Sequence, residues 1–329
     1  MSVESSAERA AAAGETLQGF QPPEGQGRSG VHGRVARHGA LTPYLFLAPF
    51  LVLFCVFIVA PAIYGIWISL HDYDFLLPHK PWVGLSNYTE LFTPGGRDAT
   101  DFWRAMKATG IFTVFSVPLL LVVPLLVALL LNRSFPGRTF FRAVFFTPYV
   151  LGVAVVGLLW RYLLDPNIGL VNSYLDQLGV HRNIPWTTDL PWAWISLVGM
   201  TVWWTLGFNA TIYLAGLQDI SPELYEAAEV DGAGKWQQFL HVTLPGLRPV
   251  LLFVLTVTIL ASANMFGQAF LVTKGAPGNA TRTAIMLIAE TGMRSFRMGV
   301  AAAMSYVLAI FLLLISLLNF RFFRMRDTS

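Results

Sequence analysis

Six stretches of this chain, each of roughly 20 or more residues, contain almost no charged side chains. A helix of about 20 apolar residues spans the hydrocarbon core of a bilayer. Lipid offers no partner for an unpaired backbone N–H group, so each stretch must be helical. Of the residues, 55% are hydrophobic and only 12% are charged, about half the charged fraction of a soluble domain. The sequence predicts an all-α membrane protein with six transmembrane helices, at about residues 43–70, 109–131, 143–164, 191–217, 249–273 and 298–320.

Proline and arginine mark two of these spans. Pro118 and Pro124 fall inside the second span, where they should kink the helix and free carbonyl groups that neighbouring helices must cover. Arg161 lies near one end of the third span, where a long side chain can reach the membrane surface. The span centres contain no Asp, Glu or Lys. Secondary carriers often use intramembrane carboxylates for coupling, so a secondary sugar or solute carrier is the alternative rather than the first interpretation.

The arginines indicate which side of the membrane faces the cytoplasm. Short cytoplasmic segments carry an excess of Lys and Arg, and the arginines gather between the second and third spans and in the C-terminal tail: Arg133, Arg138, Arg142, Arg321, Arg324 and Arg326. An even number of spans puts both ends on one side, so both termini are predicted to be cytoplasmic. The opposite side is also basic, through Lys274, Arg282, Arg294 and Arg297. Of these, Arg282, Arg294 and Arg297 suit either an anionic ligand or contact with a solute-binding protein.

Outside the spans the chain has little that suggests chemistry. Residues 1–41 lack apolar periodicity and are expected to form a disordered cytoplasmic tail. Residues 42–326 would form one six-span domain, followed by a short tail at 327–329. No basic stretch interleaved with aromatic residues indicates nucleic-acid binding. The histidines are scattered and the single cysteine lies in an apolar run, so we expect no metal site, no catalytic residues and no enzyme.

A charged, glycine-punctuated loop at 219–245 separates two long apolar stretches and must face water. Ser221 can cap a short helix, and Gly232 should end it, because glycine accepts the left-handed conformation of a helix stop. A second helical turn over residues 235–242 would then be closed by Pro245. The loop is therefore predicted to be a compact helix–turn–helix at the membrane surface.

This loop also carries a characteristic spacing, E-A-A-x3-G-x9-I-x-L-P, with Val242 in place of Ile. The matching residues, with the neighbouring Asp of a D-G-A sequence, are Glu226, Ala227, Ala228, Asp231, Gly232, Leu244 and Pro245. The segment resembles the EAA loop of ABC-importer permeases. The D-G-A sequence resembles the version found in carbohydrate importers of the maltose and glycerol-phosphate type.

The resemblance implies partners and a location. In that family the loop faces the cytoplasm and docks on an ATP-hydrolysing subunit, so the loop is expected to couple ATP hydrolysis to transport. The implied partners are two ATPase subunits, a second permease and an extracytoplasmic solute-binding protein, at the plasma (inner) membrane. ATP and Mg would be bound by the ATPase, with no cofactor in this chain. The sequence agrees, because Glu229 and Trp236 occupy positions where a phosphate-binding loop needs Gly and Ser or Thr.

Polar residues inside the spans mark a candidate substrate path, because they are costly in lipid. They recur along the fourth span and form two stripes on the fifth: Thr205, Asn209, Tyr213, Ser262, Asn264 and Gln268. Amides and hydroxyls beside aromatic residues such as Trp203, Trp204, Phe266 and Phe270 suit a neutral, hydroxyl-rich sugar. The alternative is hydrogen bonding between helices, worth about 1 kcal/mol per contact, and Thr201 and Thr258 fit that alternative better.

Two further stretches resemble carbohydrate permeases. Residues 82–88 contain a V-G-L-x-N-Y sequence, and residues 266–277 resemble F-D-Q-I-Y-x-L-T-x-G-G-P. In the second stretch Gly267 replaces Asp and Ala276 replaces Gly. The expected function is therefore a permease subunit of an ATP-driven importer, with the cargo open among a sugar, an oligosaccharide and a polyol.

Overall fold

The computed structural model describes residues 42–180 and 183–324. These residues fall into two compact units that divide between Pro61 and Ala62. The tails predicted at 1–41 and 327–329, together with Arg326, lie outside the described residues. Over the described residues the chain forms helices and no β-strand, apart from two isolated bridges that join His71 to Trp82 and Asp74 to Arg297. The all-α prediction is confirmed for this part of the chain.

Four helices in the described ranges are long and apolar enough to cross a membrane, judged by length and composition: Tyr44–Ser69, Arg97–Asn132, Trp192–Asp219 and Met298–Asn319. Two helix pairs pass the same test together, although each is bent at a break: Arg138–Val150 with Val153–Leu163, and Lys235–Gly246 with Arg248–Ala263. The chain therefore has four candidate spans, or up to six if each bent pair forms one span.

The first predicted span is an uninterrupted helical path. It consists of α2 (Thr42–Phe54), the π-helical turn η1 (Cys55–Val59) and α3 (Ala60–Ser69). Within the second unit, the Tyr306 hydroxyl of the last long helix, α15 (Met298–Arg324), donates a hydrogen bond to the Ala62 carbonyl of α3.

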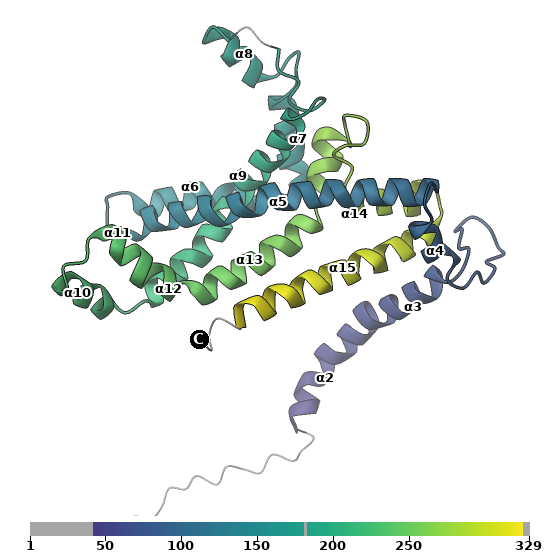
Figure 1. Ribbon diagram of the computed structural model, residues 1–329, viewed down its shortest axis with the longest axis horizontal. Helices are drawn as coiled ribbons and strands as arrows, with labels where there is room; N and C mark the ends of the chain where they lie inside the picture. Colours follow the sequence, from purple (N-terminus) through teal and green to yellow (C-terminus); the bar gives the residue numbers. More distant parts are fainter. Residues whose placement is uncertain (1–41, 181–182, 325–329) are drawn as a thin grey trace, which may run out of the picture. The chain divides into compact units, whose positions relative to one another are not determined.

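The long helix α5 (Arg97–Asn132) organises the second unit. At about 1.5 Å per residue its 36 residues extend about 54 Å, well beyond the ~30 Å hydrocarbon core. It runs from the end that carries α4 (Ser86–Phe92) to the end that carries α10 (Pro222–Val230) and α11 (Lys235–Gln238), as Figure 1 shows. The second unit thus has an α4 end and a loop end.

Both prolines lie inside α5, which continues past them as one helix. Pro124 has no N–H group to bond the carbonyl of Leu120, four residues earlier. The side-chain amide of Asn209, on α9 (Trp192–Asp219), donates to that carbonyl at 3.4 Å. The neighbouring helix thus covers a carbonyl that the proline frees, as the sequence predicts.

The third span differs from the prediction of one helix over 143–164. It is divided into α6 (Arg138–Val150) and α7 (Val153–Leu163), which meet at 96°. Leu151 and Gly152 are extended and separate the two helices. The indole of Trp204 donates to the Leu151 carbonyl at 2.9 Å, so a side chain of α9 replaces the helical bond that the break removes.

The fifth span also breaks, which corrects the expected helix over 249–273. α13 (Arg248–Ala263) is followed by its C-cap residue, Asn264, and the π-helical turn η3 (Ala269–Thr273) begins after a short interruption. The Thr283 hydroxyl donates to the Met265 carbonyl at 2.7 Å. A backbone break within a membrane span is tolerated only where protein or a water-filled cavity lines it, so we expect a cavity or close packing beside this break.

The remaining elements of the second unit complete its packing. α8 (Leu170–Gln177) follows α7, while α14 (Ala284–Ala289) and η4 (Glu290–Arg294) precede α15. One buried cluster joins α5 to α9 and the break in the fifth span through Phe112, Leu197 and Met265. Other clusters lie toward the α4 end, around Phe102, and toward the loop end, around Tyr213.

Candidate functional site

A polar cavity of about 350 Å³ lies beside the break in the fifth span. Helices α5, α6, α9 and α13 contribute to its wall, together with residues of the break itself. Five of the six predicted substrate-path residues line it, in company with Thr201 and Thr258: Thr205, Asn209, Ser262, Asn264 and Gln268. The structure therefore gathers on one cavity the residues that the sequence singles out.

The helix break explains how two stripes of the fifth span reach the same cavity. On a continuous helix, Ser262 and Asn264 would point in different directions. Because α13 ends at Ala263, the chain turns and brings Asn264 and Gln268 to the wall that Ser262 already lines. The departure from the predicted helix is thus what assembles the cavity.

Tyr213 is the sixth predicted residue, and it does not line the cavity. Its ring is fully buried among α9, α5 and α13, and its hydroxyl has no hydrogen-bond partner in the described part of the chain. It lies one helical turn beyond Asn209, where α9 packs directly against its neighbours. In this structure Tyr213 therefore belongs to the helix packing, and its place on the substrate path stays a prediction.

Some of the hydroxyl and amide protons around the cavity are already donated in hydrogen bonds within the chain. Thr205 donates to the Thr201 carbonyl at 2.9 Å, and Asn264 donates to the Leu260 carbonyl at 2.8 Å. Ser262 bonds Ser116 of α5 at 3.1 Å. The oxygens of these groups can still accept hydrogen bonds. The Gln268 amide has no hydrogen-bond partner among the described residues, so it can both donate to a ligand and accept from it.

Two of the predicted polar residues have two roles, because they form hydrogen bonds between helices and also line the cavity. Asn209 and Ser262 connect α9 and α13 to α5, as the helix-packing alternative requires. They line the cavity as well. Ser116 itself was missed from the sequence, and its signal was a polar residue among the apolar residues of the second span.

Aromatic side chains border the cavity, and the sequence identified only some of them. Trp204 and Phe266 line it as expected, whereas Tyr149 and Phe208, which stack at 4.5 Å between ring centroids, were not predicted. Trp203 instead faces a separate apolar pocket. No Asp, Glu, Lys or Arg belongs to the described lining of the polar cavity, so the cavity is uncharged and suits a ligand that carries hydroxyl groups on an otherwise apolar ring.

The loop at 219–245 forms two short helical segments joined by a turn. Ser221 is the N-cap residue of α10, as predicted, but its side chain forms no capping hydrogen bond. Gly232 has φ +77° and ends the helix as predicted. The second segment runs through α11, the π-helical turn η2 (Phe239–Thr243) and α12 (Leu244–Gly246). Pro245 lies inside this segment, in α12, and the helix continues to Gly246.

The predicted coupling residues lie on the surface of this loop. Glu226, Ala227, Asp231, Gly232 and Pro245 are exposed, while Ala228 and Leu244 are half-buried. Exposed apolar side chains flank them, with Val230 88% and Trp236 69% accessible, and Leu224 exposed as well. Apolar side chains beside small alanines give a surface on which another protein can approach closely.

The two central carboxylates of the loop differ. Glu229 accepts a hydrogen bond from Lys235 at 2.6 Å, and the bonds from Lys235 and Gln238 lower the pKa of its carboxyl group. Glu226 forms no hydrogen bond or ion pair within the described part of the chain. The side chains of Tyr225 and Thr243 bond at 3.0 Å and hold α10 to η2. The loop is thus internally fixed, and the Glu226 carboxylate stays available for an external partner.

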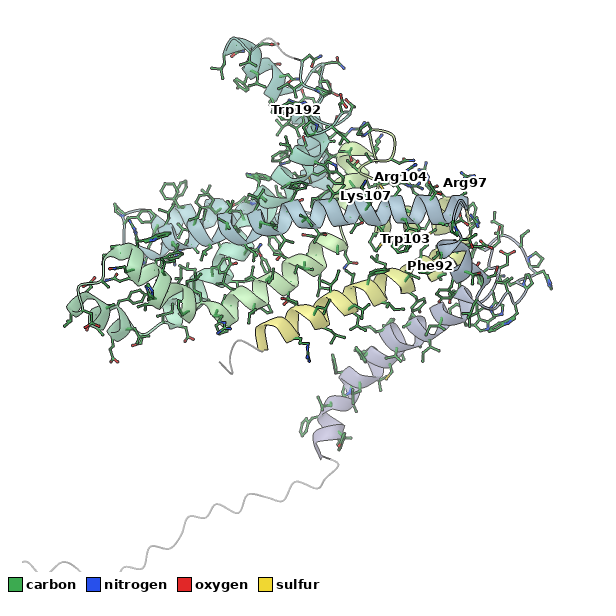
Figure 2. All side chains as sticks on the ribbon, viewed as in Figure 1. Phe92, Arg97, Trp103, Arg104, Lys107 and Trp192 are labelled. Carbon is green, nitrogen blue, oxygen red and sulfur yellow. The ribbon has the colours of Figure 1, made fainter. Side chains whose placement is uncertain are left out.

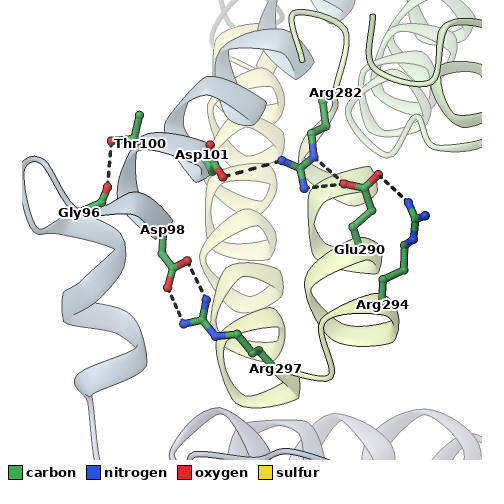
Figure 3. Close-up of polar contacts among 8 residues, drawn as sticks. All are labelled: Gly96, Asp98, Thr100, Asp101, Arg282, Glu290, Arg294 and Arg297. Carbon is green, nitrogen blue, oxygen red and sulfur yellow. Dashed lines mark hydrogen bonds and ion pairs between the residues drawn. The ribbon is translucent and has the colours of Figure 1, made fainter. Parts of the chain in front are cut away.

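The α4 end carries ion pairs instead (Figure 3). Arg297 binds Asp98 with two hydrogen bonds of 2.7 and 2.9 Å, and the hydrogen bond to Asp98 raises the pKa of Arg297. Arg282 lies 2.5 Å from Glu290 and 3.9 Å from Asp101. Both arginines, which the sequence left open for an anionic ligand or a solute-binding protein, are therefore engaged by carboxylates of the same chain.

Comparison with protein families identifies what the chain is similar to. Residues 101–327 match the family described as the binding-protein-dependent transport system inner membrane component. This match includes the loop at 219–245 and all the residues around the polar cavity.

Curated relatives are similar along most of their length. The arabinooligosaccharides transport system permease protein AraP of Bacillus subtilis is 34% identical, over 85% of this chain and 87% of the relative. The trehalose/maltose transport system permease protein MalF of Thermococcus litoralis is 33% identical, over 86% and 94%. The probable ABC transporter permease protein YurN of Bacillus subtilis is 32% identical, over 86% and 96%.

A solved structure is similar in fold and in sequence. It is the crystal structure of a bacterial ABC transporter involved in the import of the acidic polysaccharide alginate. A chain of that transporter superposes with a TM-score of 0.74 and is 26% identical, covering 86% of this chain and 95% of its own length.

Proposed function

The chain belongs to the family of binding-protein-dependent transport system inner membrane components, and we propose that the cargo of this ABC permease subunit is a carbohydrate. It is a transport component of the membrane rather than an enzyme. The observation that carries the proposal is the uncharged cavity at the break in the fifth span, where amide and hydroxyl groups lie beside aromatic rings. Relatives named for arabinooligosaccharides and for trehalose/maltose support it.

The cavity offers the contacts that a sugar requires. Sugar hydroxyls can donate to the oxygens of Thr205 and Asn264 and can exchange hydrogen bonds with the free amide of Gln268. The apolar face of a sugar ring can lie on Trp204 or Phe266. A few convergent polar groups in an otherwise apolar cavity are typical of a small-molecule site. An uncharged wall of this kind gives no group for the proton or sodium coupling of a secondary carrier.

The loop at 219–245 is proposed as the site where an ATPase subunit drives the cavity. α9 enters the loop at Asp219 and α13 leaves it at Arg248, and both helices line the cavity. A displacement of the loop is therefore carried along two rigid helices to the polar side chains. Alternating access follows if closure of the ATPases moves these helices relative to α5 and turns the cavity from one side to the other.

This function requires several partners. We infer a second permease that completes the translocation path, two ATPase subunits that bind ATP and Mg, and a solute-binding protein outside the membrane. The loop and both termini would face the cytoplasm, in a plasma membrane that the chain crosses six times. A pocket at the base of the loop, lined by Glu226, Tyr225 and Asn132 among others, supports docking at this end of the molecule.

The direct test of the assembly is affinity purification of the chain from its native membranes in mild detergent, with mass spectrometry of the co-eluting proteins. We expect an ATPase, a second permease and a solute-binding protein, and uptake into vesicles that depends on ATP. Recovery of the chain alone, with full uptake in vesicles free of ATP, would instead indicate a secondary carrier.

The cavity is tested by Asn264→Leu, which removes an amide from its wall and leaves the ion pairs and the loop unchanged. Carbohydrate uptake should fall, while the ATPase should still co-purify with the variant. Dissociation of the ATPase would show that Asn264 has a structural role. The matched control is Thr256→Val, because Thr256 lies on α13 outside the cavity and bonds Asn319.

A further inference from the structure

A second concave pocket, of about 570 Å³, opens near the outer end of the bent third span. It lies where the end of α7, the end of η3 and the π-helical turn η4 meet. Arg161, Lys274 and Arg294 supply its cationic groups, and Phe270 and Met286 supply apolar surface. The proposed function above leaves this pocket without a role.

The carboxylates of the chain do not neutralise all the cations of the pocket. Glu290 is its only carboxylate among the described lining residues, and Arg282 already binds Glu290 at 2.5 Å. Arg294 is 74% exposed and lies 3.9 Å from the same carboxylate. Arg161 and Lys274 are exposed and form no hydrogen bond or ion pair within residues 42–180 and 183–324. The pocket therefore has surplus positive charge that faces an open space.

An aromatic pair connects this pocket to the polar cavity. Phe270 lines the charged pocket, Phe266 lines the polar cavity, and the two rings stack with centroids 5.1 Å apart. Gln268, which lies between them in sequence, also lines the polar cavity. A ligand that moves from one space to the other would therefore stay in contact with ring faces. No carboxylate in the described wall of the polar cavity would repel an acidic ligand.

We propose that the charged pocket is an outer subsite for the acidic group of an anionic saccharide. The guanidinium group of Arg161 and the ammonium group of Lys274 bind the carboxylate, and the sugar ring lies on Phe270. This inference rests on the proposed carbohydrate function and adds the charge of the substrate. An anionic lipid headgroup would share the anion chemistry, but the aromatic connection to the polar cavity favours a ligand that passes inward.

The test measures direct binding to the complete permease–ATPase complex in nanodiscs of phosphatidylcholine, freed of solute-binding protein. The probes are trigalacturonate and its fully methyl-esterified form, which differ in charge and keep the same sugar backbone. Calorimetry at low salt should give about tenfold tighter binding of the acid, because charge-assisted hydrogen bonds to two cations are made only with the carboxylate. The preference should decrease as salt rises.

Variants locate the preference. Arg161→Gln combined with Lys274→Gln should bring the acid and the ester to equal affinity, while Arg161→Lys and Lys274→Arg should each retain the preference. The matched control is Arg104→Gln, because Arg104 is an exposed cation of α5 that does not line the pocket (Figure 2). Equal affinity of acid and ester in the unchanged protein, no binding of either probe, or a preference that survives the double variant would each overturn the proposal.

A second arm separates the sugar from a lipid. Phosphatidylglycerol added to the nanodiscs should leave binding of the acid unchanged. Loss of acid binding in its presence would assign the pocket to lipid headgroups and overturn the subsite. The importer function is judged separately, by ATPase co-purification and ATP-dependent uptake, so binding of the ester without acid preference would reject only this subsite.

Discussion

The two ends of the second unit use charged residues in opposite ways. At the α4 end, Arg282 and Arg297 bind carboxylates of the same chain, and Arg282 and Glu290 are each only 18% exposed. At the loop end, Glu226 is exposed and has no partner within the described residues, and Glu229 pairs only with the exposed Lys235. The α4 end therefore uses its charges to fix three segments of the fold, whereas the loop end presents charge outward.

A charged residue in a loop is therefore not by itself evidence of a contact with a partner. Asp98 and Arg297 are separated by 199 positions in the sequence and form a bidentate ion pair. Glu226 lies in an equally charged stretch and binds nothing in the described chain. Partly buried pairs contribute to stability, while exposed groups contribute mainly to recognition. Substitutions at the α4 end should therefore change thermal unfolding, whereas substitutions at the loop end should change uptake or ATPase association.

The largest effect is expected from Gly232→Leu at the loop end. Gly232 has φ +77°, and a Cβ atom added there would meet no other atom within 4 Å, so the main cost is backbone strain. That strain is about 1–2 kcal/mol for a residue other than glycine, and it should displace the turn between α10 and α11. We expect uptake to fall by roughly tenfold or more, with normal abundance in the membrane.

The control at this position is Gly232→Asn, because asparagine tolerates the left-handed conformation better than other residues. It should retain most of the uptake. Wild-type uptake by Gly232→Leu would remove the coupling role of the turn. A loss of protein from the membrane would show that Gly232 is needed for folding, like the ion pairs of the α4 end.

The next largest effect is expected at the α4 end, from Glu290→Gln. This change leaves Arg282 with Asp101, 3.9 Å away, as its remaining carboxylate in the described chain. Removing one partner of a fully buried pair costs about 3–5 kcal/mol, and the partial exposure of this pair should reduce the loss to about 1–2 kcal/mol. Thermal unfolding of the purified complex measures it. Arg294→Gln is the control, and an equal loss there would contradict the assignment.

The sequence predicts the helices and the loop well because both depend on local properties. Apolar runs identify the membrane segments, and Gly232 ends α10 as its conformational freedom suggests. Five of the six predicted path residues reach one cavity. The breaks after Val150 and Ala263 were not predicted, because hydropathy measures how apolar a segment is and not whether its backbone stays helical. Gly152 and Asn264 lie at the two breaks, and they were the local signals that the helices are interrupted there.

Residues that depend on packing could not be assigned from the sequence. Tyr213 has the same four-residue spacing as Thr205 and Asn209, yet α9 meets its neighbours at that level and buries the ring. Likewise, only the folded chain brings Asp98 to Arg297 and Arg282 to Glu290. Spacing defines a helix face, but the height at which neighbouring helices diverge decides which residues on that face line a cavity.

A smaller effect is expected from Glu226→Gln at the loop end. Its carboxylate is free to bind a cation of the ATPase, and an exposed pair of this kind is worth up to about 1 kcal/mol. ATPase association should weaken by about threefold to fivefold, with no change in thermal unfolding. Glu229→Gln is the matched control, because Lys235 already occupies that carboxylate. Equal weakening of ATPase association by both variants would show that the partner does not bind the Glu226 carboxylate in preference to that of Glu229.

The smallest effect concerns the Glu229–Lys235 pair and its dependence on pH. Hydrogen bonds from Lys235 and Gln238 lower the pKa of Glu229 in the folded loop. The pair therefore stabilises the loop above the ordinary carboxyl pKa of about 4.3, and its contribution is lost as the pH falls through the lowered value. Hydrogen exchange of the turn between α10 and α11 should be slightly faster in Glu229→Gln than in the unchanged protein at pH 7, and the two should converge in acid.

Because both side chains are largely exposed, salt should weaken this difference at pH 7 far more than it weakens the effect of Glu290→Gln. An equal response to salt at both ends would remove the distinction between charges that fix the fold and charges that face a partner.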